Sequence, residues 1–210
     1  MKRIAIIGSG HLGQQIAYHI HQDSEDKVVA FFDEFKEKDT LVDNIPIIGG
    51  NNDIEEAYEN KLFDEILIAI GYKHLDFKKK IFEQLVNKIP FYSFIHSSVY
   101  LDPSAKIGRG TIIYPGCILD QYVEIGDNVL LNIGCVIAHD SKIGNHSFLS
   151  PAVSIAGFVK VEELCIIGIN STIIDNINIT SHTQIGGATV VIKNLEKLGL
   201  YVGNPARFIK

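Results

Sequence analysis

One histidine is followed directly by a carboxylate, and this pair of residue types could carry out proton transfer. The residues are His139 and Asp140, in the sequence Ile137-Ala138-His139-Asp140. A neutral imidazole accepts a proton at physiological pH, and a neighbouring carboxylate can hold the ring in the tautomer that does so. The pair predicts a general base that activates a nucleophile. The alternative is a histidine that is only solvated at a turn.

A glycine-rich segment near the N-terminus has the parts of a nucleotide site. Gly8, Gly10 and Gly13 have the spacing G-x-G-x-x-G, and Asp33 follows twenty residues after the last of them. Glycines let the backbone approach a diphosphate at a helix N-terminus, and an acidic residue after the next strand can accept ribose or base donors. Gly71 would border the same crevice. The pattern predicts nucleotide binding, and the alternative is a tight turn that packs a helix on a strand.

The spacing of the other histidines and of the cysteines argues against a metal centre. His146 and His182 are 36 residues apart, which in the repeat described below separates them by about 10 Å. Two ligands of one zinc ion cannot be so far apart. Cys117, Cys135 and Cys165 lack the C-x-x-C spacing of metal or redox sites. We therefore expect free thiols and no metal.

The framework around His139 is an aliphatic residue at every sixth position from Ile95 to Val191. Four residues after each comes a mostly small or β-branched residue, and all three cysteines occupy that position. A period of six fits neither an α-helix nor a flat strand, but it fits a three-sided coil of eighteen residues. The repeat predicts a left-handed parallel β-helix with turn glycines, such as Gly108 and Gly126, at positive φ. Gly157, one coil after His139, would leave room for a ligand beside the ring.

The first half of the chain alternates predicted strands and helices instead. The expected strands are Arg3 to Ile7, Val28 to Phe32 and Ile66 to Ile70, and a loop is expected at Pro46 to Gly50. The run Gly8 to Gly13 is expected to open a helix, and two further helices should extend through Asn60 and to about Lys88. This order is typical of a Rossmann-like βαβαβ unit. We predict an α/β domain at residues 1–92 and a β-helix domain at residues 93–210. Its last residues, Lys193 to Lys210, are expected to form an irregular or partly helical tail.

The composition and net charge of the chain restrict the classes of molecule that it is expected to bind. The net charge is −6 and no basic tract is present, which argues against a nucleic-acid or anionic-membrane partner. No apolar stretch approaches the roughly 20 residues that span a bilayer. We therefore expect a cytoplasmic protein that acts on small molecules.

The order of the two predicted domains resembles that of the nucleotide-sugar N-acetyltransferases. These hexapeptide-repeat enzymes are related to the sialic acid O-acetyltransferase-like proteins, and the resemblance covers essentially the whole chain. Its most specific stretches are Gly8 to Gly13, Phe31 to Glu34, Ile68 to Gly71, Ile137 to Asp140, Ile167 to Asn170, Ile185 to Ala188 and Val202 to Ala206.

The resemblance implies a homotrimer that transfers acetyl from acetyl-CoA to the 4-amino group of a nucleotide-linked 4-amino-4,6-dideoxy sugar, with active sites between subunits. His139, beside Asp140, would deprotonate the amine. Outward aliphatic residues such as Ile112 and Ile133 would gain from burial in a trimer.

The resemblance also implies two binding regions. The nucleotide sugar would be held by Gly8, Ser9, Gly10, His11, Asp33, Glu34 and Gly71. Acetyl-CoA would be held by His146, Phe148, Gly157, Ile169, Gly187, Asn204, Pro205 and Arg207. The Gly157 N–H would donate to the developing oxyanion. Phe148 stands where several relatives carry a second histidine.

Three other hypotheses stay open at this stage. A sialic acid or sugar O-acetyltransferase would use the same base, although a neutral amine is the better nucleophile. A non-catalytic trimer would bind the nucleotide sugar through the glycine motif without transferring an acyl group. A nicotinamide-dependent enzyme would use the glycine loop, but it would lack the second half of a dinucleotide fold. The sequence names neither the nucleotide, whether UDP, dTDP or GDP, nor the sugar.

Overall fold

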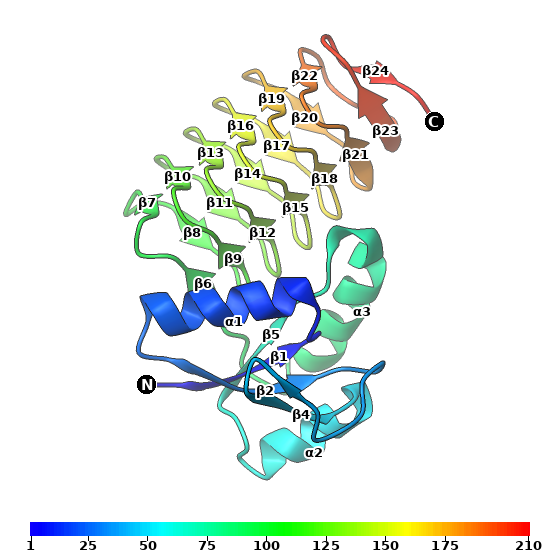
Figure 1. Cartoon of the computed structure of the whole chain (residues 1–210). Coiled ribbons are helices and arrows are strands. Elements are labelled where there is room, and N and C mark those ends of the chain that lie inside the picture. The colour runs from blue at the N-terminus through cyan, green and yellow to red at the C-terminus, as the bar shows by residue number, and fades with distance from the viewer. The chain divides into compact units, whose positions relative to one another are not determined.

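The computed structural model describes residues 1–210, and the chain divides into two units, Met1–Ser93 and Phe94–Lys210 (Figure 1). The first unit holds a five-stranded sheet with the order β3-β4-β2-β1-β5. Its strands are β1 (Arg3–Ile7), β2 (Lys27–Phe32), β3 (Leu41–Val42), β4 (Ile45–Gly49) and β5 (Glu65–Ile68). Its helices are α1 (His11–Asp23), α2 (Ile54–Glu59) and α3 (Leu75–Leu85), and single 3₁₀ turns lie at η1 (Asn51–Asp53) and η2 (Tyr72–His74).

The central strand β1 shows why these residues form a buried parallel sheet. β1 pairs in parallel with both β2 and β5, and its residues from Ile4 to Ile7 are buried. A strand covered on both faces reads as a continuous apolar run. Helix α1 buries Gly13, Ile16, Ala17 and Ile20, which is the spacing of one apolar helix face. The Rossmann-like α/β prediction is confirmed.

The prediction of a loop at Pro46 to Gly50 is wrong for most of that segment. Residues Ile45–Gly49 form β4, with Ile45, Ile47 and Gly49 buried in alternation. β4 pairs in parallel with β2 and antiparallel with the short β3. Alternating burial against β2 therefore outweighs the turn tendency of proline and glycine. The proline is tolerated because its neighbour on the outer side is a two-residue strand near the sheet edge.

The second unit is the predicted β-helix, built from two- and three-residue strands. They are β6 (Phe94–Ile95), β7 (Tyr100–Leu101), β8 (Lys106–Ile107), β9 (Ile112–Ile113), β10 (Ile118–Leu119), β11 (Glu124–Ile125), β12 (Leu130–Leu131), β13 (Val136–Ile137), β14 (Lys142–Ile143), β15 (Phe148–Leu149), β16 (Ser154–Ile155), β17 (Lys160–Val161), β18 (Ile166–Ile167), β19 (Thr172–Ile173), β20 (Asn178–Ile179), β21 (Thr183–Ile185) and β22 (Val190–Val191).

These strands form the three faces of the β-helix (Figure 1). We call them the β13 sheet (β7-β10-β13-β16-β19-β22), the β14 sheet (β8-β11-β14-β17-β20) and the β15 sheet (β6-β9-β12-β15-β18-β21, continued by β23 and β24). From β6 to β22, each strand residue pairs in parallel with the residue eighteen positions later, as Ile137 does with Ile155. The predicted coil length is therefore confirmed.

The interior of the β-helix is filled as the repeat predicts. The aliphatic positions from Ile113 to Val191 are at most 3% exposed, and the three cysteines are buried free thiols. Burial raises the pKa of the Cys165 thiol to about 12. A thiol that stays protonated and enclosed is a core residue and a poor nucleophile.

The glycines after the aliphatic positions have a different role from the predicted one. From Ile107 to Ile185, positive φ occurs three residues after each aliphatic position, for example at Gly110, Asp140 and Phe158, and not at Gly108 or Gly126. At Gly108 and Gly126 an added Cβ would collide with the next coil. Close stacking of coils, rather than a left-handed conformation, therefore requires glycine there.

The C-terminal tail is predicted to be irregular or partly helical, but it forms strands. β23 (Gly199–Val202) extends the β15 sheet, and β24 (Arg207–Phe208) pairs antiparallel with it. The peptide bond between Asn204 and Pro205, in the connecting turn, is cis. No helix in the chain has the length and apolar character that crossing a membrane requires.

Candidate active site

His139 and Asp140 lie in the turn that joins β13 to β14, at the corner between the β13 and β14 sheets. Ile137 points into the core, so the residues that follow it turn outward. The His139 side chain is 48% exposed, and its Nδ1 lies 3.0 Å from Oδ2 of Asp140. Asp140 has φ +59°, a left-handed conformation that aspartate tolerates better than most residues. This turn allows two neighbouring residues to contact each other through their side chains.

The contact with Asp140 sets the tautomer of the imidazole. A carboxylate only accepts hydrogen bonds, so Nδ1 carries the proton and donates it to Oδ2. Nε2 is then left with a lone pair, and it makes no hydrogen bond within the chain. A half-exposed imidazole whose Nε2 lone pair is unbonded and whose Nδ1 is backed by a carboxylate is the arrangement of a general base.

Gly157 forms the floor beneath the His139 ring. A Cβ at Gly157 would lie 2.7 Å from Cε1 and 2.8 Å from Nε2 of His139. The space directly above Gly157 holds the imidazole itself, and room for a ligand beside the ring stays a prediction. The closeness also shows that the ring stacks directly on the next coil.

Phe158 forms a wall beside the same ring, and sequence reasoning missed it. The rings of His139 and Phe158 are 5.1 Å apart between centroids and nearly perpendicular, at 85°. Phe158 lies eighteen residues after Asp140, at the same position of the repeat. The signal that could have identified it is an aromatic residue at an outward turn position one coil from a candidate base.

The residues predicted to hold acetyl-CoA lie at three different corners of the β-helix. Gly157 shares the corner of His139. Ile169 and Gly187 lie at the corner between the β15 and β13 sheets, where a Cβ at Gly187 would be 3.1 Å from Cγ2 of Ile169. His146 lies at the third corner, between the β14 and β15 sheets. A single chain therefore does not bring these residues together.

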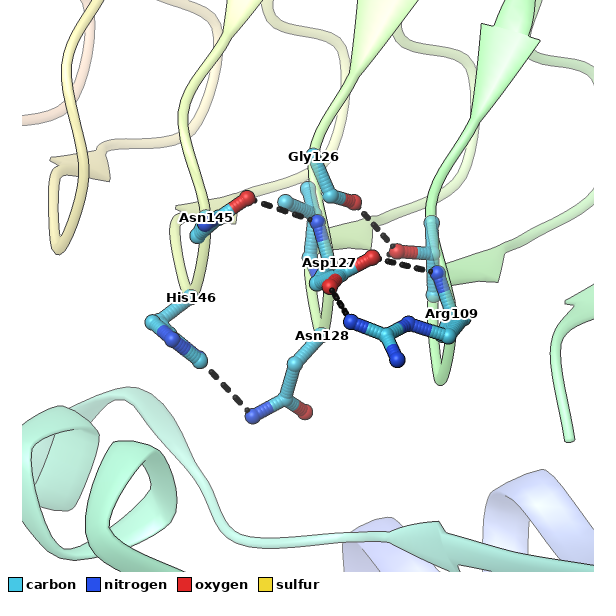
Figure 2. A network of polar contacts seen from close by, with 8 residues as sticks. Arg109, Gly126, Asp127, Asn128, Asn145 and His146 are labelled. Atoms are coloured by element: carbon cyan, nitrogen blue, oxygen red, sulfur yellow. Dashed lines mark hydrogen bonds and ion pairs between the residues drawn. The ribbon is translucent and has the colours of Figure 1, made fainter. Parts of the chain in front are cut away.

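Two of the predicted acetyl-CoA contacts are buried. His146 is 3% exposed and Phe148 is 7% exposed. The ring of His146 lies with Nδ1 3.0 Å from Nδ2 of Asn128, beside an ion pair between Arg109 and Asp127 (Figure 2). These contacts give His146 a structural role in the turn. A direct contact of His146 or Phe148 with acetyl-CoA remains a prediction that their burial does not favour.

The remaining predicted contact region is the turn between β23 and β24. Asn204, Pro205 and Arg207 are all exposed. Arg207 borders a cavity of about 710 Å³ together with Lys193 and Lys197. Three cationic side chains against one carboxylate, Glu196, line this cavity, and such an excess of positive charge favours a ligand that carries phosphate groups.

A second cavity lies in the N-terminal unit, at the carboxyl ends of β1 and β2. Its volume is about 200 Å³, and it is lined by Gly8, Asp33 and Glu34 among the predicted residues. Phe35 and Phe77, which the sequence analysis did not single out, form aromatic walls. Ligands of open parallel sheets bind at this edge, and aromatic faces suit a nucleotide base.

Asp33 organises the glycine loop. Its Oδ2 accepts hydrogen bonds from the backbone N–H and the hydroxyl of Ser9, at 2.9 Å and 2.6 Å, and its Oδ1 accepts from the Phe35 N–H at 2.9 Å. Partial burial acts to raise the pKa of Asp33, but these bonds and the nearby Lys36 ammonium outweigh it and hold the pKa below its ordinary value. Ser9 is buried, so it supports the loop rather than facing a ligand. Glu34 accepts from the Asn51 N–H at 2.5 Å.

The glycines predicted to hold the nucleotide sugar, Gly8, Gly10 and Gly71, divide into two kinds. Gly8 has φ +97°, and a Cβ there would lie 2.8 Å from the Ala69 carbonyl oxygen, so the turn itself requires glycine. Gly10 and Gly71 have no other atom within 4 Å of an added Cβ. They precede α1 and η2, and His11 is the exposed first residue of α1. Steric packing therefore explains why Gly8 is a glycine, but it does not explain why Gly10 and Gly71 are glycines.

No three side chains of the types that bind metal ions come together in this structure. His146 and His182, for example, differ in environment, because the first is buried and the second exposed. The residues in the two candidate sites are suited to proton transfer and to holding a nucleotide.

Comparisons with known proteins found matches for both units of the chain. Residues 3–85 match the family model of the PglD N-terminal domain, and residues 122–157 match the bacterial transferase hexapeptide family (six repeats). The acetyltransferase domain of PglB from Neisseria gonorrhoeae is 22% identical, with 100% of both chains covered and a TM-score of 0.89.

Two further solved structures share the whole architecture. A variant of GDP-perosamine N-acetyltransferase from Caulobacter crescentus, in complex with CoA and GDP-perosamine, is 24% identical, with 100% of this chain and 98% of that chain covered and a TM-score of 0.93. WeeI from Acinetobacter baumannii is 23% identical, with 100% of both chains covered and a TM-score of 0.83. The predicted fold, an α/β unit followed by a left-handed β-helix, is confirmed over the full length.

Proposed function

We propose that this chain, which joins a PglD-type N-terminal domain to a hexapeptide transferase domain, is a cytoplasmic acetyltransferase that acts as a homotrimer. It moves acetyl from acetyl-CoA to the 4-amino group of a nucleotide-linked 4-amino-4,6-dideoxy sugar. The observation that carries the proposal is the His139 imidazole, which is 48% exposed and has its Nδ1 bonded to Asp140. A fold shared end to end with an enzyme solved with CoA and GDP-perosamine supports the choice of substrates.

The proposed reaction is an acyl transfer without a covalent enzyme intermediate. The amine nitrogen attacks the thioester carbonyl carbon while Nε2 of His139 takes a proton from the amine. Asp140 stabilises the imidazolium that forms. The oxyanion then collapses, the C–S bond breaks, and the proton passes to the departing thiolate. The products are the N-acetylated sugar and CoA with a free thiol.

A site between subunits would reconcile the positions of the predicted acetyl-CoA residues. His139 lies at one corner of the prism, and Ile169 and Gly187 lie at another. Packing two prisms side by side can bring these two corners to opposite sides of one groove. We therefore propose that each active site takes His139 from one subunit and the Ile169 corner from its neighbour.

An exposed apolar stripe supports the trimer better than the residues first chosen. Ile112 was expected to face outward, but it is buried within the single chain, whereas Ile133 is exposed. Tyr100, Ile118 and Val136 are stacked outward on consecutive strands of the β13 sheet and are all exposed. Contiguous apolar surface of this kind marks an interface.

The mass of the protein in solution tests the trimer. Light scattering after size exclusion should give a mass close to three times the 23.3 kDa of the chain. Ile118→Asp should shift the mass toward one chain, because a charge would be buried without a partner. Leu41→Asp, at an exposed apolar residue of the N-terminal unit, is the matched control and should leave the mass unchanged. A wild-type monomer would remove the trimer from the proposal.

Nucleotide binding at the N-terminal cavity is tested at Gly10. A Cβ at this position meets no protein atom, so Gly10→Ala should leave the melting temperature without ligand nearly unchanged. If a diphosphate approaches the N-terminus of α1 there, the added methyl group should weaken nucleotide-sugar binding by about tenfold. Isothermal titration with UDP-, dTDP- and GDP-sugars measures this change. Gly134→Asn, in open space on the β-helix, should bind as the wild type does, and equal affinity of Gly10→Ala would contradict this phosphate position.

The direct test of the function is CoA thiol release from acetyl-CoA with a panel of UDP-, dTDP- and GDP-linked 4-amino-4,6-dideoxy sugars. Turnover of one amine, with the acetyl group found on that amine by mass spectrometry, is the expected result. Turnover of hydroxyl acceptors alone would replace the proposal with sugar O-acetylation. Binding of nucleotide sugar without any thiol release would make the protein a binding module.

A further inference from the structure

We propose that Phe158 is a positioning residue that fixes the imidazole of His139 in its reactive orientation. The inference rests on the proposed function, because it assigns Phe158 a part in the same site. Phe158 was not among the residues that the sequence or the family resemblance pointed to.

The imidazole of His139 is held on three sides. Asp140 accepts from Nδ1 at 3.0 Å. The Gly157 backbone lies beneath Cε1 and Nε2. Phe158 packs its ring perpendicular to the imidazole, with 5.1 Å between the centroids. The open direction that remains is the one available to a substrate.

Packing alone does not explain an aromatic residue at position 158. Phe158 has φ +58°, a left-handed conformation that is unfavourable for a bulky side chain. The same position of the repeat has positive φ at asparagines such as Asn170 and also at Tyr122 and Leu164, so this conformation belongs to the turn and does not by itself single out Phe158. Phe158 is 55% exposed, so burial in the core does not account for an aromatic side chain here. What distinguishes Phe158 from Tyr122, which has the same φ of +58°, is its ring contact with His139.

The perpendicular ring should keep the imidazole against Asp140. An exposed histidine side chain can otherwise rotate, and each rotation breaks the Nδ1 bond and turns Nε2 away from the substrate. Loss of the Phe158 ring should therefore reduce the fraction of molecules with a correctly oriented base. Such a loss lowers kcat without changing how tightly either substrate binds.

Three variants test the inference. Phe158→Asn removes the ring and keeps a residue suited to positive φ, and it should lower kcat by about tenfold, the upper range for one aromatic pair. The KM values for acetyl-CoA and the amino sugar should stay within about twofold. Phe158→Tyr keeps the ring and should restore kcat. Tyr122→Asn is the matched control, because Tyr122 also has φ +58° and is 61% exposed, yet makes no ring contact with His139.

A second readout does not depend on turnover. Nitrogen NMR of the ring-labelled protein should show the His139 imidazole with its proton on Nδ1 in the wild type and in Phe158→Tyr. In Phe158→Asn the signals should move toward a mixture of the two tautomers. If the wild type acetylates no acceptor but the tautomer still shifts, the proposed function fails and the positioning role stands. Unchanged kcat and unchanged NMR in Phe158→Asn, or a rise in KM alone, would overturn the inference.

Discussion

Asparagine in place of His139 should lower kcat by about two to four orders of magnitude, the usual contribution of a general base. The asparagine side chain fills similar space and can still hydrogen-bond to Asp140, but it cannot take the proton from the attacking amine. Both KM values should stay within about threefold, because the proposed base contacts the reacting atoms only in the transition state. Initial rates of thiol release at saturating substrate measure the effect.

The control for this prediction is His182→Asn, at an exposed histidine of the β14–β15 corner. Its kcat should equal that of the wild type. The melting temperature of His139→Asn should change little, since the side chain that it replaces is 48% exposed. If His139→Asn keeps more than a tenth of the wild-type kcat, the proton is accepted elsewhere and the assignment of His139 as the base is wrong.

The sequence was sufficient for those features that depend on periodicity. An aliphatic residue every sixth position defines which side chains face inward, so the burial of Ile137 and the outward turn of His139 followed directly from the register. The same register placed Cys117, Cys135 and Cys165 inside the core. A repeat that is continued without interruption leaves little freedom in where each residue lies.

Other features depend on backbone conformation or on packing between coils, which the sequence pattern does not specify. The bond between His139 and Asp140 requires the left-handed turn at Asp140. The role of Gly157 depends on how far the imidazole leans over the next coil. In the N-terminal unit, Pro46 indicated a loop because its turn tendency is local, whereas the alternating burial of β4 depends on contact with β2.

A single chain does not bring the predicted acetyl-CoA residues together into one site. The predicted acetyl-CoA residues lie at three corners of the prism, and no property of the sequence assigns corners from different subunits to one groove. The family resemblance supplied that expectation, and the exposed stripe of Tyr100, Ile118 and Val136 gives it a physical basis in this chain.

Alanine in place of Gly157 should lower kcat by about two orders of magnitude with little loss of stability. The added Cβ would lie 2.7 Å from Cε1 of His139, so the ring must move away by several tenths of an ångström or more. The ring is the end of a flexible, exposed side chain, and its movement costs the fold little. A reacting group displaced by about 1 Å can cost 100-fold in rate. The backbone N–H of residue 157 is kept, so a donor to the oxyanion is not removed.

A double-mutant cycle with His139→Asn separates the two roles that Gly157 could have. If the methyl group acts by displacing the imidazole, Gly157→Ala should cause little further loss of kcat in the His139→Asn background, because the displaced group is already gone. The substituted asparagine side chain has no ring for the new Cβ to push aside. An additive loss in the double variant would instead indicate that Gly157 acts on the substrate directly. Because both single variants are expected to fold, the cycle distinguishes positioning of the base from a separate contact at the thioester.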